Sequence, residues 1–95
     1  MKISMQKFGT MLNSRPGGRE AFLAIRPSLP RNGESILTLD FMGVEVLTPS
    51  FADEFITNIL ETYPKKVQFV NTKNITVEKT LEFLSPDWRE RDLLP

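Results

Sequence analysis

The feature that most constrains the fold of this sequence is an apolar segment typical of a buried β-strand, which is followed closely by an amphipathic helix. Residues 36–41 form a near-continuous apolar run, which is typical of a central parallel strand and predicts burial on both of its faces. From residue 51 onward the apolar residues recur every three or four positions until Pro64, and this spacing predicts a helix over residues 48–63 that lies on a sheet. Its buried rows are expected to be Phe51, Phe55, Ile59 and Ala52, Ile56, Leu60, Tyr63, and its wet face Asp53, Glu54, Thr57, Asn58 and Glu61.

Three shorter elements are predicted upstream. Residues 2–6 alternate polar and apolar side chains, which indicates a half-buried strand, and residues 10–12 are expected to return beside it as a hairpin. Residues 18–26 have helical spacing. Pro27 is expected to end or bend this helix because proline lacks a backbone N–H group.

Downstream, residues 66–71 predict another main strand, and Asn74 or Thr76 can cap a last helix. The Ser-Pro-Asp sequence at 85–87 indicates a break in that helix, after which Trp88 is expected to fold back on the core. Strands therefore alternate with helices. This predicts an α/β fold, a single small domain with a mostly parallel sheet of about four strands and helices packed on it. The domain is expected to span residues 1–95, with its core at about 3–84 and a C-terminal extension at 85–95.

Composition excludes several classes of function. The chain has no Cys and no His, so thiol nucleophiles, imidazole bases and the commonest metal ligands are absent, and neither an enzyme, a cofactor nor a metal site is expected. Twelve basic residues balance twelve acidic ones, which argues against nucleic acid as a partner. No apolar stretch is long enough for a membrane span, and residues 1–7 do not resemble a secretory signal, so a cytoplasmic protein is expected.

The start of the 48–63 helix carries the main candidate site. Either Thr48 caps the helix with Pro49 in its first turn, or Ser50 caps it with Asp53 as the matching acid. Ser50 is thus interpreted either as a structural residue or as a regulatory phosphoacceptor, since a helix N-terminus favours phosphate. The expected partner-binding residues are Thr48, Ser50, Asp53 and Glu54, with Glu45 from the connection at 43–47.

A weaker candidate site is the Arg15-Pro16-Gly17-Gly18-Arg19 segment, which is interpreted as a loop. Its two arginines can grip an anionic ligand or a carboxylate, and this gives the alternative function of a small-molecule or nucleotide-binding module. Asp40 lies at the end of the central strand, where ligands of open α/β sheets bind. The other interpretation of Asp40 is that its carboxylate accepts backbone N–H groups in the turn at Gly43.

The junction Leu39-Asp40-Phe41-Met42-Gly43-Val44, followed by Leu47-Thr48-Pro49-Ser50-Phe51-Ala52-Asp53-Glu54-Phe55, resembles the bacterial STAS-like domain family of unknown function. Phe8-Gly9, Arg15, Gly18-Arg19 and the strand Val67–Asn71 also resemble that family, so the likeness covers about residues 3–84. The family is similar to the STAS domains of anti-sigma-factor antagonists, which act in signalling without a cofactor. The resemblance implies a regulatory protein–protein interaction module, a histidine-kinase-like ATPase as partner, and phosphorylation at Ser50, which falls at the antagonists' phosphorylated serine.

Overall fold

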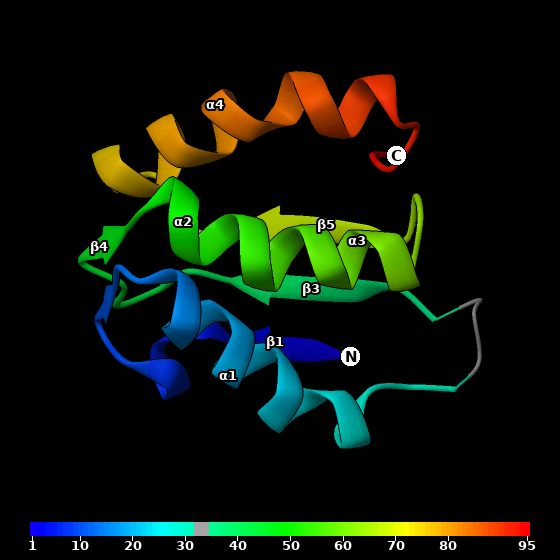
Figure 1. Cartoon of the computed structure of the whole chain (residues 1–95), viewed down its shortest axis with the longest axis horizontal. Coiled ribbons are helices and arrows are strands. Elements are labelled where there is room, and N and C mark those ends of the chain that lie inside the picture. Colours follow the sequence, from blue (N-terminus) through cyan, green and yellow to red (C-terminus); the bar gives the residue numbers. More distant parts are fainter. Residues whose placement is uncertain (32–34) are drawn as a thin grey trace.

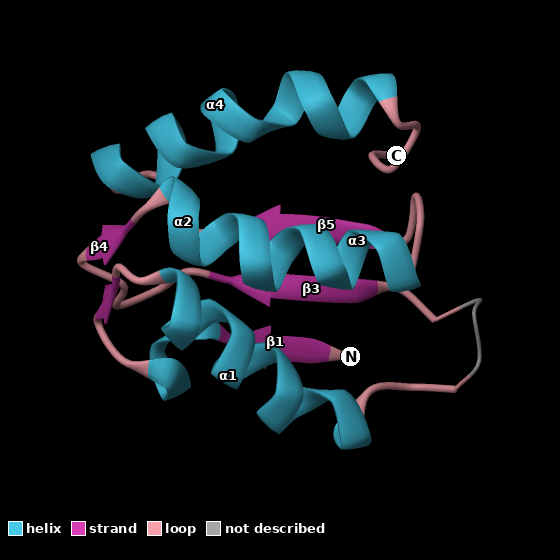
Figure 2. Cartoon of the chain, viewed as in Figure 1, coloured by secondary structure: helices cyan, strands magenta, loops and turns pink. Residues whose placement is uncertain are grey.

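The chain folds as two parallel sheets with helices, as the computed structural model shows for residues 1–31 and 35–95 (Figures 1 and 2). The main sheet has the strand order β1-β3-β5 and the small sheet pairs β2 with β4. The strands are β1 (Lys2–Ser4), β2 (Met11–Leu12), β3 (Leu37–Asp40), β4 (Val46–Leu47) and β5 (Val67–Val70). The helices are α1 (Arg15–Ile25), α2 (Pro49–Ala52), α3 (Asn58–Thr62) and α4 (Ile75–Glu90). The predicted α/β fold is confirmed, although the main sheet has three strands rather than about four.

The helices cover only one face of the main sheet. Figure 1 shows α1, α2 and α3 in front of the strands and α4 alongside β5. The register places Ile3, Leu39 and Phe69 side by side toward the helices, and Thr38 beside Gln68 on the other face. Thr38 is partly exposed there and accepts a hydrogen bond from the side-chain amide of Gln68 at 3.1 Å. The prediction that the central strand is buried on both faces is therefore wrong.

The predicted N-terminal hairpin is also wrong. β1 pairs in parallel with β3, whereas β2 pairs in parallel with β4, which lies in the segment predicted to be a connection, 43–47. A 3₁₀ turn over Met5–Phe8 and Gly9, whose φ is +121°, separate the two N-terminal strands. Two short strands can therefore belong to different sheets although they are close in sequence.

The long amphipathic helix is present as one continuous run, in which α2 and α3 are joined by a π-helical turn over Asp53–Thr57. We call this run the α2–α3 helix. All seven residues of its two predicted buried rows are buried. Thr57 was predicted on the wet face but is buried, because the wider π turn rotates it toward α4. There its hydroxyl accepts a hydrogen bond from the indole Nε1 of Trp88 at 2.8 Å.

Helix α4 continues through the sequence that predicted a break. Pro86 lies inside the helix and cannot donate to the carbonyl of Glu82, one turn earlier. The hydroxyl of Ser85 donates to that carbonyl instead, at 3.2 Å. Trp88 is buried, as predicted, and Leu93 is buried as well, so residues beyond 84 belong to the core rather than to an extension. No helix in the described ranges is both long and apolar enough to cross a membrane.

Candidate functional site

The candidate site is the corner where the α2–α3 helix begins. Pairing of β4 with β2 brings Thr48 next to Leu12, whose carbonyl accepts the Thr48 backbone N–H at 3.0 Å. The Thr48 hydroxyl caps the helix by accepting the backbone N–H of Phe51 at 3.5 Å, and Pro49 occupies the first turn. Of the two capping arrangements that the sequence left open, the structure has the one with Thr48.

Ser50 is exposed in the first turn of the helix. Its hydroxyl makes no hydrogen bond with any residue that the structure describes, so Ser50 does not serve as the helix cap. Asp53, its expected capping partner, instead bonds to the guanidinium of Arg15 and to the hydroxyl of Thr57. The Ser50 side chain is therefore available to another molecule.

Arg15 holds together two of the predicted acidic residues. Its Nη1 lies 2.9 Å from Oδ2 of Asp53 and 3.2 Å from Oε1 of Glu54. Arg19 lies 3.8 Å from the same oxygen of Glu54. The hydrogen bonds to Asp53 and then to Glu54 raise the pKa of the Arg15 guanidinium. The acidic residues beside Ser50 are thus neutralised, and the corner does not present a free acidic edge.

The Arg15–Arg19 segment is not a loop. Residues 15–19 form the start of α1, with Ser14 as the cap, since its hydroxyl accepts the backbone N–H of Gly17 at 2.9 Å. Gly18 allows this end of α1 to touch the α2–α3 helix, because a Cβ there would lie 2.5 Å from the carbonyl oxygen of Phe51. The prediction of a loop is therefore wrong. Arg15 is engaged by carboxylates of the same chain, and anion binding by Arg15 and Arg19 stays a prediction.

Two hollows flank the exposed face of the corner. One has a cavity volume of about 430 Å³ and is lined by residues that include Arg15, Ser50, Asp53 and Phe83. The other, of about 400 Å³, is lined by residues that include Thr48, Pro49, Lys79 and Phe83. Phe83 belongs to α4, stands between the two hollows and is 71% exposed, the most exposed of the large apolar side chains in the described part of the chain.

Phe83 was missed by the sequence analysis. A signal was present in the sequence: Val77, Leu81, Leu84 and Trp88 recur at helical spacing, and Phe83 falls outside this row. Val77 and Trp88 are buried, whereas Phe83 is exposed. An aromatic residue on the wet face of an amphipathic helix is a candidate contact residue, since exposed apolar patches mark interaction sites.

Glu45 precedes Thr48 in the chain, in the connection that leads to the helix, and it is exposed. Its backbone is fixed at both ends: its N–H donates to the carbonyl of Thr10 at 2.9 Å, and its carbonyl accepts the side-chain amide of Asn74 at 3.0 Å. Asn74 also caps α4, as one of the two predicted alternatives stated. The connection before the helix is therefore held between β2 and the start of α4.

Asp40 is not part of this corner. Its Oδ1 accepts the side-chain amide of Asn71 at 2.7 Å and the backbone N–H of Met42 at 3.0 Å, and its Oδ2 lies 3.2 Å from the ammonium of Lys2. The bond from Asn71, followed by the one from Met42, lowers the pKa of the Asp40 carboxyl. The interpretation of Asp40 as an acceptor of a turn N–H is confirmed, and it is not joined to Arg15 and Arg19.

Comparisons with known proteins agree with this architecture. The model of a STAS-like domain of unknown function matches residues 18–77, which include β3, the α2–α3 helix and β5. Searches among curated proteins and among solved structures gave no significant match. The matched region covers more than half of the sequence, and the chain belongs to the family of STAS-like domains of unknown function.

Proposed function

We propose that this domain is a non-catalytic regulatory module that works by binding another protein. We further propose that the contact is made by the corner around the start of the α2–α3 helix. We call this the α2–α4 surface and define it by Glu45, Thr48, Pro49, Ser50, Asp53, Glu54 and Phe83. The observation that carries the proposal is the exposed Phe83 ring between two hollows, beside the unengaged hydroxyl of Ser50. Aromatic side chains that fit such a surface commonly provide most of a binding energy.

Ser50 is the proposed point of regulation and a histidine-kinase-like ATPase the proposed partner, by analogy with the STAS domains of anti-sigma-factor antagonists. In the reaction the Ser50 oxygen attacks the γ-phosphorus of ATP, and ADP and the hydroxyl proton leave. The product places about two negative charges beside Asp53 and Glu54. Arg15 lines the same hollow as Ser50 and lies against both carboxylates, so a cation is available to offset that repulsion.

A purified ATPase of this class from the same organism provides the test. Its affinity is measured for the wild-type domain and for Phe83→Ser, with Leu23→Ser as the matched control because Leu23 is a half-exposed apolar residue on α1. Phe83→Ser should weaken binding by about 2 kcal/mol or more, whereas Leu23→Ser should leave it unchanged.

The same mixture with ATP tests the modification. Mass spectrometry should find one phosphoryl group on the wild-type domain and none on Ser50→Ala, and Ser50→Asp should change the affinity for the ATPase. Binding that is equally strong for every variant would remove the α2–α4 surface from consideration. Phosphorylation at another residue would remove Ser50 alone.

A further inference from the structure

Helix α4 carries an exposed row of three side chains that recur every four residues. Phe83 is the centre of the row, with Lys79 four positions before it and Asp87 four positions after it. The side chains of Lys79 and Asp87 are 67% and 63% exposed. Since residues four apart are neighbours on a helix surface, the row presents a cation, an aromatic ring and an anion in that order. We call it the α4 row.

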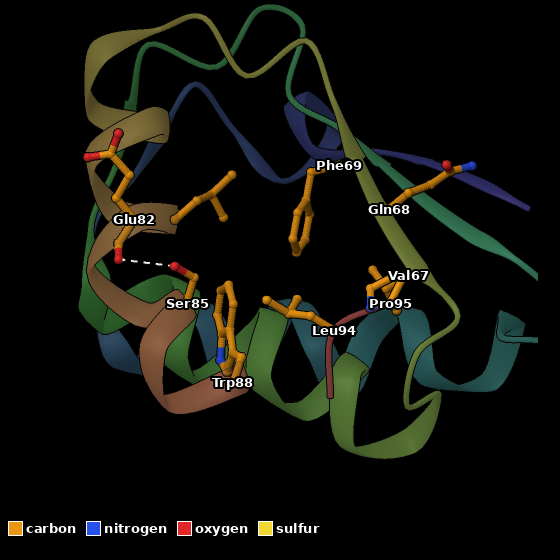
Figure 3. A pocket seen from close by; sticks show the side chains of 9 residues that line it. Val67, Gln68, Phe69, Glu82, Ser85, Trp88, Leu94 and Pro95 are labelled. Carbon is orange, nitrogen blue, oxygen red and sulfur yellow. Dashed lines mark hydrogen bonds between the residues drawn. The ribbon is translucent and has the colours of Figure 1, made fainter. Parts of the chain in front are cut away.

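The α4 row lies apart from the side of the helix that faces β5. On that side Ser85 and Trp88 line an apolar hollow of about 450 Å³ (Figure 3), and the ring of Trp88 packs on that of Phe69 with centroids 6.0 Å apart. The α4 row instead borders the two hollows of the corner. Lys79 and Phe83 line one of them, and Phe83 and Asp87 line the other. A molecule that contacts the row therefore reaches both hollows.

The order of the charges selects the kind of molecule that fits. A partner helix needs an acidic residue opposite Lys79, an apolar residue opposite Phe83 and a basic residue opposite Asp87. The α4 row has this order when it is read in the reverse direction. Around a two-fold axis at Phe83, two antiparallel copies of α4 place Lys79 of each copy opposite Asp87 of the other and bring the two Phe83 rings together. Rows with a spacing of four residues also form the commonest helix crossings in globular proteins.

The ion pairs that these charges make within the chain do not oppose this arrangement. Nζ of Lys79 lies 3.6 Å from Oε2 of Glu82, and Oδ2 of Asp87 lies 3.5 Å from Nη1 of Arg91. Both pairs are exposed to water, where an ion pair contributes little to stability. Beside two packed Phe83 rings less water surrounds the charges. Lys79 and Asp87 then interact more strongly across the interface and fix the relative orientation of the two helices.

We propose that the α4 row is a self-association site, at which two copies of this chain form an antiparallel dimer about Phe83. The two aromatic rings are its apolar centre, and the two Lys79–Asp87 pairs give it direction. Ser50 lines the same hollow as Phe83 and Asp87, so the second copy covers Ser50. The dimer thus keeps the ATPase from the α2–α4 surface, and this last step rests on the proposed function.

The experiment follows self-association of the purified full chain by sedimentation velocity. From about 10 μM to about 1 mM, the range of weak complexes, the wild type should pass from monomer to dimer. Lys79→Asp and Asp87→Lys each place like charges opposite one another, and each should weaken the dimer by about tenfold or more. Glu20→Lys is the control because Glu20 is exposed on α1, and it should leave the dimer unchanged. Circular dichroism checks that each variant is folded.

A mixture of the two charge variants tests the direction of the helices. In a mixed dimer the new acid of Lys79→Asp lies opposite the new lysine of Asp87→Lys, and the two unaltered residues lie opposite each other. Both pairs are then attractive, so the mixture should recover the wild-type affinity to within about threefold. If either variant fails to fold, the wild type at low and high salt serves instead, and salt should weaken its dimer.

Phosphorylation by the ATPase separates this proposal from the proposed function. Lys79 and Asp87 are not among the residues that define the α2–α4 surface. The rate of phosphorylation per molecule should fall as the wild-type concentration rises and dimers form, whereas Lys79→Asp should show a smaller fall. An equal fall in both proteins would contradict the covering of Ser50. Absence of phosphorylation in both would contradict the proposed function alone, because the sedimentation results do not depend on it.

Three sedimentation results would overturn the proposal. The first is a wild-type chain that stays monomeric throughout this range of concentrations. The second is a dimer that keeps its affinity in Phe83→Ser or in both charge variants. The third is a mixture of the two folded charge variants that stays monomeric, which would mean that the helices do not run antiparallel about Phe83.

Discussion

The indole of Trp88 and the hydroxyl of Thr57, 31 positions apart in the chain, form a buried hydrogen bond of 2.8 Å between α4 and the α2–α3 helix. Trp88 is 1% and Thr57 is 7% exposed, so neither polar group has ready access to water. The Thr57 hydroxyl in turn donates to Oδ1 of Asp53 at 3.2 Å, and Asp53 binds Arg15. A continuous chain of polar contacts therefore runs from α4 through the π turn to the start of α1.

The replacement Thr57→Val should destabilise the domain. It keeps the shape of the side chain but leaves the indole N–H of Trp88 buried without an acceptor, which costs about 1–3 kcal/mol. Urea unfolding followed by far-UV circular dichroism measures the loss, because this signal remains when Trp88, the single tryptophan, is replaced. Trp88→Phe, made alone and together with Thr57→Val, is the companion variant, because it removes the indole N–H group that would lack an acceptor. If the Thr57 hydroxyl matters only through this bond, Thr57→Val should cost much less in the Trp88→Phe protein than in the wild type.

Gly18→Ala should also destabilise the domain, although alanine normally favours a helix over glycine by about 0.5–1 kcal/mol. The added Cβ would lie 2.5 Å from the Phe51 carbonyl oxygen and 3.0 Å from Cβ of Glu54, so α1 and the α2–α3 helix would have to move apart. We expect a net loss of about 1–3 kcal/mol in unfolding free energy, which is typical of overpacking.

Gly17→Ala is the matched control for this contact. Its Cβ would meet the Ser14 hydroxyl at 2.8 Å, and rotation of this short side chain relieves the contact but weakens the cap of α1, which is worth about 1 kcal/mol. The next neighbour is the Phe51 ring at 3.7 Å, so the helices need not move apart. Thermal melting should rank Gly18→Ala below Gly17→Ala. Equal melting temperatures would show that the two helices are not in close contact at Gly18.

The same contact explains why part of the fold was not predictable. Pro16, Gly17 and Gly18 are poor helix residues in isolation, so local propensity indicated a loop. The helix begins there because Ser14 caps it and because the crossing with Phe51 requires a residue without a Cβ. That second reason depends on a residue 33 positions away, which is invisible to a local pattern.

Elements whose pattern is local were predicted well. Phe51, Phe55 and Ile59 follow helical spacing and are all buried, and Asn74 and Thr48 are the caps of the helices that follow them. The sequence predicted which helix start carries the candidate site, but it did not predict the contacts that the residues of the site make with one another. Arg15 and Asp53 were both singled out, but as separate features, because their ion pair joins residues 38 positions apart.

Asp40 should make the stability of the domain depend on pH in the acid range. Its pKa is lowered in the folded state by the hydrogen bonds from Asn71 and Met42 and by the ammonium of Lys2. A carboxyl with a depressed folded pKa stabilises the fold above its unfolded pKa, near 3.8, and this contribution disappears as the pH falls through the lower folded value.

The urea concentration at the midpoint of unfolding, measured from pH 6 downward, should therefore decrease once the pH is below about 4. In Asp40→Asn this decrease should be smaller. Asn71→Ala tests the named cause, because it removes the first of the three interactions and should raise the Asp40 pKa measured by carboxyl NMR. An unchanged Asp40 pKa in Asn71→Ala would contradict the role given to that amide.

The last prediction concerns the charge balance beside Ser50. Arg15 pairs with Asp53 and Glu54, and all three side chains are partly exposed, so Arg15→Met should change stability only slightly at moderate salt. Ser50→Asp adds a negative charge to the hollow that Arg15 lines. It should therefore lower the unfolding free energy less when Arg15 is present than in the Arg15→Met protein. A double-mutant cycle of unfolding free energies at low and high salt measures this coupling, which should shrink as salt screens the charges. Additive effects at low salt would mean that Arg15 does not act on a charge at position 50, and the repulsion from Asp53 and Glu54 would then stand against phosphorylation of Ser50.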